Sequence, residues 1–305
     1  RCVTTLSSHE VALGYEENTP DPSAYVQFEV DLDASLNACN SLAAPRSDSL
    51  KTTLSKLGDV KQKIYLLAWT TTPWTLPGNT ALAINPNSKY SLVRTRSPKN
   101  DEDLYLLLGS NLLGVALQDK FDIIATFQGS HLSGLKYKPL YDPFSANLPD
   151  GSLMGINSDG LHQINNDNLH ETRKTVENSW QVHGADFVSM KEGTGIVHVA
   201  PAFGQDDYVL GESLHLLLVQ HVNPEGKIIG NYKFSGDDAK KQGDTSIARD
   251  LEERCLIYKQ EIYRHTYPFC WRCHTPLLYY AKPSWYIRTT AIKDKLISKN
   301  QDINW

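Results

Sequence analysis

The chain has 305 residues, of which 40% are hydrophobic and 21% are charged, and its formal net charge is −5. This length fits one large or two medium domains, and the 6 Trp, 15 Tyr and 8 Phe exclude a disordered chain or a low-complexity fibre. The acidic balance excludes a protein that holds nucleic acid through its overall charge, so any such contact must be local.

Membrane and secretion signals are not evident in the sequence. The longest apolar candidate, Leu214 to Val219, is far shorter than the ~18 to 20 residues that cross a bilayer. Residues 1–5 do not read as a secretory leader. Five cysteines are too few and too scattered for a disulfide framework. We therefore expect a cytoplasmic protein without a membrane contact.

The predicted elements are mostly strands. Residues 18–22, Asn-Thr-Pro-Asp-Pro, predict a turn and a boundary, and the alternation over 24–31 predicts a half-buried strand. The dense apolar run over 64–70 is typical of a central strand. Further strands are expected over 80–85, 90–95, 104–108, 121–127, 185–190 and 195–199, separated by Gly, Pro, Asn and Asp.

Helices are fewer. Ser47 or Asp48 can cap a short helix that runs through Leu57, and Asp206 can open one that runs through Leu214 to Val219. A third helix is expected over 245–258, with its charged residues toward water. The Asn-, Asp- and Gly-rich segment 151–168 predicts an exposed loop. These elements indicate a β-rich mixed α/β fold.

The most unusual segment is 69–79, Trp-Thr-Thr-Thr-Pro-Trp-Thr-Leu-Pro-Gly-Asn. Three adjacent hydroxyls follow an apolar strand, and the next residue, a proline, ends regular pairing. Backbone N–H groups and threonine hydroxyls can then point into a cleft, where they suit an oxyanion or an ester carbonyl. The simpler alternative is that threonine is a good strand residue before a turn, although the flanking Trp and Pro weigh against it.

A second segment, 193–208, is predicted to be a strand, a Pro/Gly turn and a helix start. This order places His198 near the end of the strand and puts Asp206 and Asp207 at the positive pole of the helix. All three can face one pocket. Taken alone, the two aspartates are explained as a helix cap and a first-turn carboxylate, and the histidine as a structural residue.

Together, residues 69–79 and 193–208 closely resemble the editing domain of isoleucyl-tRNA synthetase. Residues 263–273 and 282–287 resemble the return path toward that enzyme's catalytic domain, so the resemblance spans essentially the whole chain. It implies a mixed α/β, β-rich fold with a β-barrel-like editing body, a few helices and a small peripheral cysteine-containing module formed by the two termini.

The resemblance also implies a division of the chain. Residues 23–261 would form the editing domain, and 1–22 with 262–290 a connecting module, while 291–305 would begin the return to the catalytic domain. Neither a His-Ile-Gly-His-type nor a Lys-Met-Ser-Lys-Ser-type motif occurs, so no aminoacylation site is expected in this chain. Valyl and leucyl relatives carry an arginine in the threonine-rich loop. Here that position is Thr72, which favours the isoleucyl assignment.

The resemblance implies that the chain hydrolyses valyl-tRNA(Ile). Whether it also hydrolyses valyl-adenylate is not decided by the sequence. A binding site distinguishes only weakly between two amino acids that differ by one methylene, so a second site hydrolyses the product that carries the wrong one. Isoleucyl-tRNA synthetase is itself the general example of this limit. Asp207 would pair with the α-ammonium of the substrate. The ester, the terminal ribose and the attacking water would contact Thr70, Thr71 and Thr72. Direct hydrolysis without a protein nucleophile is our preferred mechanism.

The remaining substrate contacts implied by the resemblance form a pocket that excludes isoleucine by size. His198 and Trp74 would wall this pocket. Thr75, Asn79 and Asp206 are further candidates, which turn architecture and helix capping explain almost as well. Editing needs no cofactor, and ATP would serve only the full-length enzyme. The implied partners are the acceptor end of tRNA(Ile), its valyl group and the remainder of the synthetase, and we expect a monomer.

A Cys-x-x-Cys pair, Cys270 and Cys273, has the spacing of half a tetrahedral zinc site. The resemblance implies a second pair upstream, of which Cys2 would be one member. His265 or His274 can substitute for a missing ligand. A redox dithiol and plain thiols are the alternatives.

The sequence offers two other functions, which the motifs and the intact Asp207 and Thr70 to Thr72 disfavour. One is a catalytically silent module that only docks tRNA, and the other is a small zinc-dependent redox protein. Scattered basic side chains can touch RNA phosphates, although ordinary surface charge explains them as well. These side chains are Lys61, Lys63, Arg94, Arg96 and Lys99.

Overall fold

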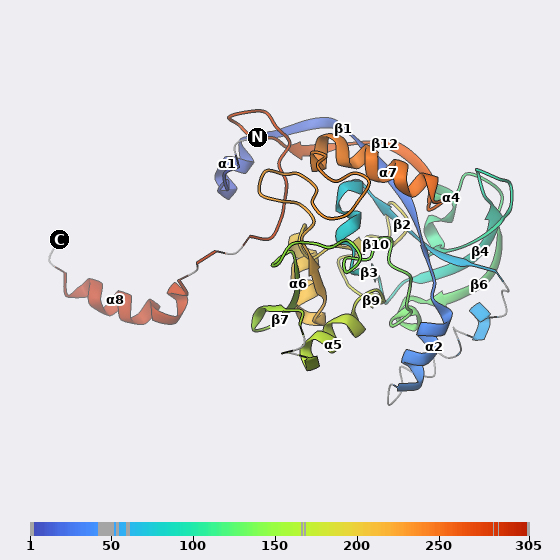
Figure 1. Cartoon of the computed structure of the whole chain (residues 1–305), viewed down its shortest axis with the longest axis horizontal. Helices are drawn as coiled ribbons and strands as arrows, with labels where there is room; N and C mark the ends of the chain where they lie inside the picture. Colours follow the sequence, from blue (N-terminus) through green and yellow to red (C-terminus); the bar gives the residue numbers. More distant parts are fainter. Residues whose placement is uncertain are drawn as a thin grey trace.

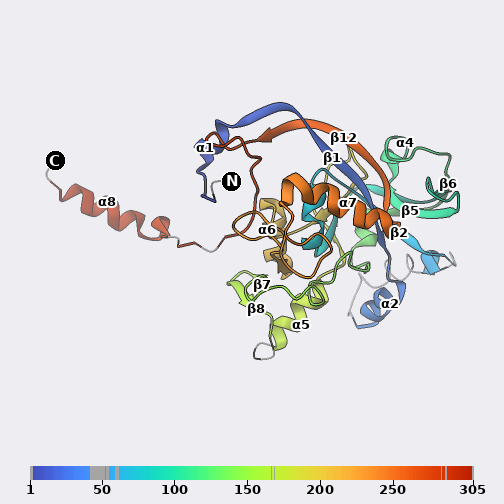
Figure 2. The same ribbon diagram turned by 45° about the horizontal axis from the view of Figure 1, so that its top comes forward.

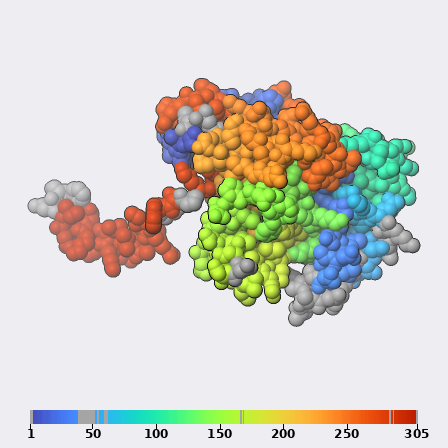
Figure 3. Space-filling model, viewed as in Figure 1, coloured from blue at the N-terminus to red at the C-terminus, as the bar shows by residue number. Residues whose placement is uncertain are grey.

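The computed structural model describes residues 3–41, 52, 55–58, 62–165, 167, 169–282, 284–285 and 287–303. Within these ranges the chain forms one rounded body from which a C-terminal arm projects, ending in helix α8 (Lys293–Gln301) (Figures 1 and 2). No residue of α8 is buried. The space-filling view shows the arm standing clear of the body (Figure 3). None of the described helices combines the length and apolar composition needed to cross a bilayer.

The largest sheet has six strands in the order β12-β1-β2-β5-β4-β6. The pair β2 and β5 is parallel, and the other neighbours are antiparallel. The mixed α/β, β-rich fold is thus confirmed, but no sheet of the described strands closes into a barrel. The strands are β1 (Tyr15–Glu29), β2 (Ile64–Thr70), β4 (Lys89–Arg96), β5 (Asp103–Gly109), β6 (Asp122–Gln128) and β12 (Ile257–Pro268).

The remaining described strands form two three-stranded sheets, β10-β3-β9 and β11-β7-β8. Their strands are β3 (Ala81–Ile84), β7 (Leu153–Asn157), β8 (Gly160–Gln163), β9 (Val182–Gly184), β10 (Ile196–Val199) and β11 (Leu217–Val219). The other α-helices are α1 (Ser8–Ala12), α2 (Leu32–Ser41), α4 (Leu113–Ala116), α5 (Leu169–Asn178), α6 (Gln205–Leu214) and α7 (Asp244–Glu253). The 3-10 helices are η1 (Pro73–Gly78), η2 (Ser110–Leu112), η3 (Gly129–Leu132) and η5 (Thr289–Ile292). The segment η4 (Ala239–Gly243) is a π-helix.

Strand β2 is apolar on both faces because it separates two parts of the core. Leu66 is fully buried in the main core with Phe28 of β1. Its neighbour Leu67 points to a second cluster, which α4 covers with Leu113. Each such leucine contributes about 1.5–3 kcal/mol through burial. This two-sided burial explains the dense apolar run and fixes the point where the threonine-rich loop begins.

The expected turn at residues 18–22 is wrong, because these residues lie inside β1. Among the described strands, this half of β1 pairs with β12 alone, while β2 joins only at residues 24–29. One edge is therefore free, and a proline there interrupts no ladder hydrogen bond. The proposed boundaries at 22/23 and 261/262 fall within the β1–β12 pair, where Pro22 faces Ile262 and Ser23 faces Glu261.

Most other strand predictions are confirmed, with small differences at the ends, but 185–190 is not a strand. The strand β9 ends at Gly184, and a turn bond from the Val188 N–H to the Ala185 carbonyl follows. The segment 151–168 is also not a simple exposed loop, since it contains the β7–β8 hairpin. The apolar residues of β7 pair with β11, which the local composition does not reveal.

Both helices expected to continue into apolar runs end earlier. Helix α6 ends at Leu214, and α7 ends at Glu253, each followed by a strand. The left-handed residues after them are His215 (φ 56°) and Cys255 (φ 57°), so the usual glycine stop signal is missing. Helices α1, α2, α4, α5 and α8 have no counterpart among the predicted elements. The helix expected from Ser47 or Asp48 to Leu57 lies mostly outside the described residues.

Candidate active site

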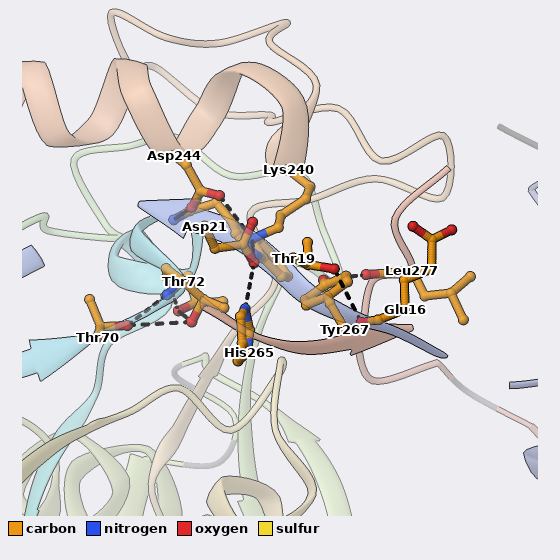
Figure 4. Close-up of polar contacts among 12 residues, drawn as sticks. Glu16, Thr19, Asp21, Thr70, Thr72, Lys240, Asp244, His265, Tyr267 and Leu277 are labelled. Atoms are coloured by element: carbon orange, nitrogen blue, oxygen red, sulfur yellow. Dashed lines mark hydrogen bonds and ion pairs between the residues drawn. The ribbon is translucent and has the colours of Figure 1, made fainter. Parts of the chain in front are cut away.

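The threonine-rich loop gathers hydroxyls where β2 ends. Proline at position 73 begins η1, a position that tolerates its fixed φ and missing N–H. The Thr70 hydroxyl accepts the Thr72 N–H at 3.1 Å, and the two side-chain oxygens lie 3.4 Å apart (Figure 4). Thr72 Oγ1 is also 3.3 Å from Thr75 Oγ1. Thr71 is half-buried beside this cluster. The hydroxyl cluster, Thr70, Thr72 and Thr75, therefore contains one residue beyond the threonine triplet.

The hydroxyl cluster is joined to His198 on β10. Thr75 Oγ1 lies 3.1 Å from His198 Nε2, and Thr75 already donates its hydroxyl hydrogen to the Thr72 carbonyl at 2.8 Å. His198 must then donate from Nε2. Its Nδ1 is buried and has no hydrogen-bond partner among the described residues. Burial lowers the pKa of His198 to about 4, so the ring is neutral at physiological pH.

The carboxylate of Asp207 is held at the end of the same strand. Two residues after His198, the Ala200 N–H donates to Asp207 Oδ2 at 2.9 Å. The side chain turns back past Gly204, where an added Cβ would lie 3.0 Å from the Asp207 carboxyl. Burial, helped by the charge of Asp206, raises the pKa of Asp207 to about 6, and the Ala200 N–H opposes the rise. Asp207 is half-buried and largely ionised at pH 7, whereas Asp206 is exposed.

The structure thus connects the two unusual segments of the sequence. Two successive hydrogen bonds connect Thr72 to Thr75 and Thr75 to His198, and so join the loop to β10. Asp207 lies over the turn that follows β10. Hydroxyls, a neutral imidazole and a carboxylate occur together. Such a set can bind a cation at one end and stabilise an oxyanion at the other.

Trp74 lies in the main core, with only 2% of its surface exposed. Its ring packs edge-on against Phe203, with centroids 5.1 Å apart. Its backbone N–H donates to Asp244 Oδ1 at 2.9 Å, and its carbonyl lies 2.9 Å from His221 Nε2. Trp74 therefore supports the loop from within the core. Sequence reasoning missed Asp244 and His221, because no local motif marks residues that contact the loop from distant parts of the chain.

Asn79 has a structural position at the end of η1. Its amide donates to the Ala81 carbonyl at 2.8 Å, and its Oδ1 accepts the Tyr137 hydroxyl at 2.7 Å. The side chain is buried, so both bonds are shielded from water. Asn79 thereby fixes the exit from the loop.

We predict that Asn79→Ala lowers the free energy of unfolding by about 1–3 kcal/mol, because it leaves the buried Tyr137 hydroxyl without its acceptor. Urea denaturation measures this loss. The exposed Asn100→Ala is the matched control and should change stability by less than about 0.5 kcal/mol. Normal stability of Asn79→Ala together with lost activity would assign Asn79 to substrate binding instead.

The described residues do not form a complete zinc site. No group of three or more His, Cys, Asp or Glu side chains in the described ranges is placed to hold a metal. Cys270 is buried and Cys273 exposed, while Cys2 lies outside the described residues. His265 is bonded to Asp21 at 2.9 Å, and His274 lies 3.9 Å from a Glu16 oxygen. Zinc therefore stays a prediction.

Comparison with known proteins finds isoleucine–tRNA ligases among the similar sequences. No protein-family model matches the chain. The isoleucine–tRNA ligase of Dehalococcoides mccartyi strain 195 is 43% identical over 312 residues, covering 100% of this chain and 27% of the ligase. That of Thermus thermophilus is 40% identical over 307 residues, covering 100% and 23%. The chain thus spans about a quarter of these relatives' length. Among solved structures, the editing domain of the P. knowlesi cytosolic leucyl-tRNA synthetase is 15% identical, with a TM-score of 0.37 and coverage of 63% and 62%.

Proposed function

Because this chain is homologous along its whole length to part of the isoleucine–tRNA ligases, we propose that it is an editing domain that hydrolyses valyl-tRNA(Ile) to valine and free tRNA. One observation carries the proposal. The bond between Thr75 Oγ1 and His198 Nε2 joins the hydroxyl loop to the strand beyond which Asp207 is held. The same site would accept valyl-adenylate, whose acyl group also carries an α-ammonium.

Asp207 is the anchor for the substrate's cationic end. The Ala200 N–H holds Oδ2, which leaves Oδ1 to accept the α-ammonium. A charge-assisted hydrogen bond of this kind fixes the orientation of the ester relative to the loop. Because valine and isoleucine share the ammonium group, Asp207 orients both and discriminates neither.

The ester carbonyl and the attacking water contact the threonine-rich loop. Thr70, Thr71 and Thr72 offer hydroxyls that stabilise the oxygen of the tetrahedral centre as its charge develops, while the Thr72 N–H is already donated to the Thr70 hydroxyl. Water attacks the carbonyl carbon and loses a proton, the bond to the ribose oxygen breaks, and that oxygen takes up the proton, so that valine and free tRNA are released. His198 is neutral, so it contributes a hydrogen bond and bulk rather than a positive charge.

Partners and location follow from the same assignment. We place the acceptor end of tRNA(Ile), its valyl group and the remainder of the synthetase as the partners of this chain, in the cytoplasm. ATP would be needed only by the full-length ligase. The proposal gives no role to a membrane, and the monomeric state stays a prediction.

We predict that the wild-type polypeptide releases valine from valyl-tRNA(Ile) at least about tenfold faster than it releases isoleucine from isoleucyl-tRNA(Ile), because a pocket limited by bulk excludes the extra methylene. Release of radiolabelled amino acid measures both rates. A rate for valyl-tRNA(Ile) no higher than in buffer would refute the assignment. Binding of tRNA without hydrolysis would instead support a docking module.

A further inference from the structure

A buried cluster of charges lies behind the hydroxyl loop. Lys240 Nζ is 2.8 Å from Asp21 Oδ2 and 3.1 Å from Asp244 Oδ2 (Figure 4). The exposed fractions of these side chains are 5%, 10% and 5%, respectively. His265 Nε2 lies 2.9 Å from the same Asp21 oxygen. The buried charge cluster, Asp21, Lys240 and Asp244, therefore connects β1, η4 and α7, and the half-buried His265 attaches it to β12.

In the described part of the chain, a hydrogen bond from the backbone of Trp74 to Asp244 connects this cluster to the loop. While Asp244 Oδ2 faces Lys240, its Oδ1 accepts the Trp74 N–H at 2.9 Å. Trp74 stands in η1 between Thr72 and Thr75, whose hydroxyls lie 3.3 Å apart. The carboxylate therefore holds the stretch of backbone that sets the spacing of two members of the hydroxyl cluster.

Stability alone is a weak reason for such an arrangement. Burying ions carries a desolvation penalty that their attraction often only offsets, so apolar residues could fill this space as well. Apolar side chains would not supply an acceptor for the Trp74 N–H. Lys240 holds the second oxygen of the carboxylate, which fixes the direction of the first. On its other side Trp74 is held by His221, so both backbone groups of this residue are fixed by buried side chains.

We propose that Asp244 is a positioning residue for ester hydrolysis: it fixes the Trp74 peptide and, through it, the spacing of Thr72, Thr75 and His198. This inference rests on the proposed editing function. Asp21 and His265 extend the attachment to the β1–β12 pair, which fastens the loop to the largest sheet. Asp244 itself touches neither the substrate nor the reacting atoms.

The test compares Asp244→Ala with Asp250→Ala. Asp250 is a buried carboxylate on the same helix that accepts the Tyr141 hydroxyl at 2.8 Å and pairs with Arg254 at 3.2 Å. Asp244→Ala should lower kcat for valyl-tRNA(Ile) by about 10- to 100-fold, the cost of a small misplacement of reacting groups, and change KM less than about threefold. Asp250→Ala should leave kcat within about twofold. Asp244→Asn, which keeps an oxygen for the Trp74 N–H, should restore most of the lost kcat.

A second measurement does not depend on activity. Hydrogen exchange followed by NMR should show at least tenfold faster exchange of the Trp74 amide in Asp244→Ala, and no change in Asp250→Ala or in the amides of β2. If the wild type does not hydrolyse valyl-tRNA(Ile), the proposed function fails, while the exchange data still decide whether Asp244 holds the loop. Unchanged kcat and Trp74 exchange in Asp244→Ala, or equal losses in Asp250→Ala, would overturn the inference.

Discussion

Replacing Asp207 with asparagine should reduce hydrolysis of valyl-tRNA(Ile) by at least about 100-fold without unfolding the protein. Asparagine keeps an oxygen for the Ala200 N–H, but it removes the negative charge that would hold the α-ammonium. Loss of this anchor leaves the ester free to move relative to the hydroxyl loop, and misorientation is costly in catalysis. The initial rate of valine release measures the effect.

The free energy of unfolding should increase in Asp207→Asn at neutral pH, although the rate of hydrolysis falls. Burial raises the pKa of Asp207 from 3.8 to about 6, so between these values the folded protein retains a proton that the unfolded chain has lost. The contribution of this residue to folding therefore falls as pH rises from about 4 to above 6. Asp207→Asn avoids that loss, so at pH 7.5 it should be more stable than the wild type, on the order of 1–3 kcal/mol. The difference should vanish near pH 3.

Two controls separate this role from a general effect of charge. Glu212→Gln removes one negative charge from the last turn of α6 and should leave the rate unchanged. In the wild type, lowering the pH through about 6 should slow hydrolysis, because protonation removes the anchor charge. If Asp207→Asn retains more than half of the wild-type rate, Asp207 does not hold the substrate.

The parts of the site that the sequence predicts are those encoded in short segments. Strand 64–70 and the loop after it follow from an apolar run that stops before Pro73. His198 and Asp207 are linked by a strand, a turn and a helix start, which are also local features. Their approach to the loop depends on the pairing of β10 with β3, which no short segment encodes.

The supports of the loop could not be predicted in this way. Asp244 lies 170 positions from Trp74, and Lys240 lies 219 positions from Asp21. Such pairs form because α7 and η4 pack against η1 and β1, and a charged residue in the sequence looks like surface until that packing is known. The strand across 18–22 was missed for a related reason. Its prolines are tolerated because no other described strand pairs with that edge, which depends on where β2 begins to pair.

Replacing His198 with alanine should allow the protein to hydrolyse isoleucyl-tRNA(Ile), which the wild type spares. The imidazole is 7% exposed and bonded to Thr75, so it occupies space directly beside the hydroxyl cluster. Its removal opens room for one more methylene, and a limit set by bulk is then lost. We expect the rate for isoleucyl-tRNA(Ile) to rise at least about tenfold, so that the preference for valine falls by a similar factor.

Parallel deacylation assays with the two aminoacyl-tRNAs measure this ratio. His162→Ala is the matched control, because His162 lies on β8 and bonds Thr175 rather than the loop. The pKa of His198 is lowered to about 4 by burial, so the imidazole stays neutral and the wild-type ratio should not change between pH 6 and 8. An unchanged ratio in His198→Ala would show that another side chain excludes isoleucine. A ratio that varies with pH in this range would show that discrimination depends on a charge rather than on bulk.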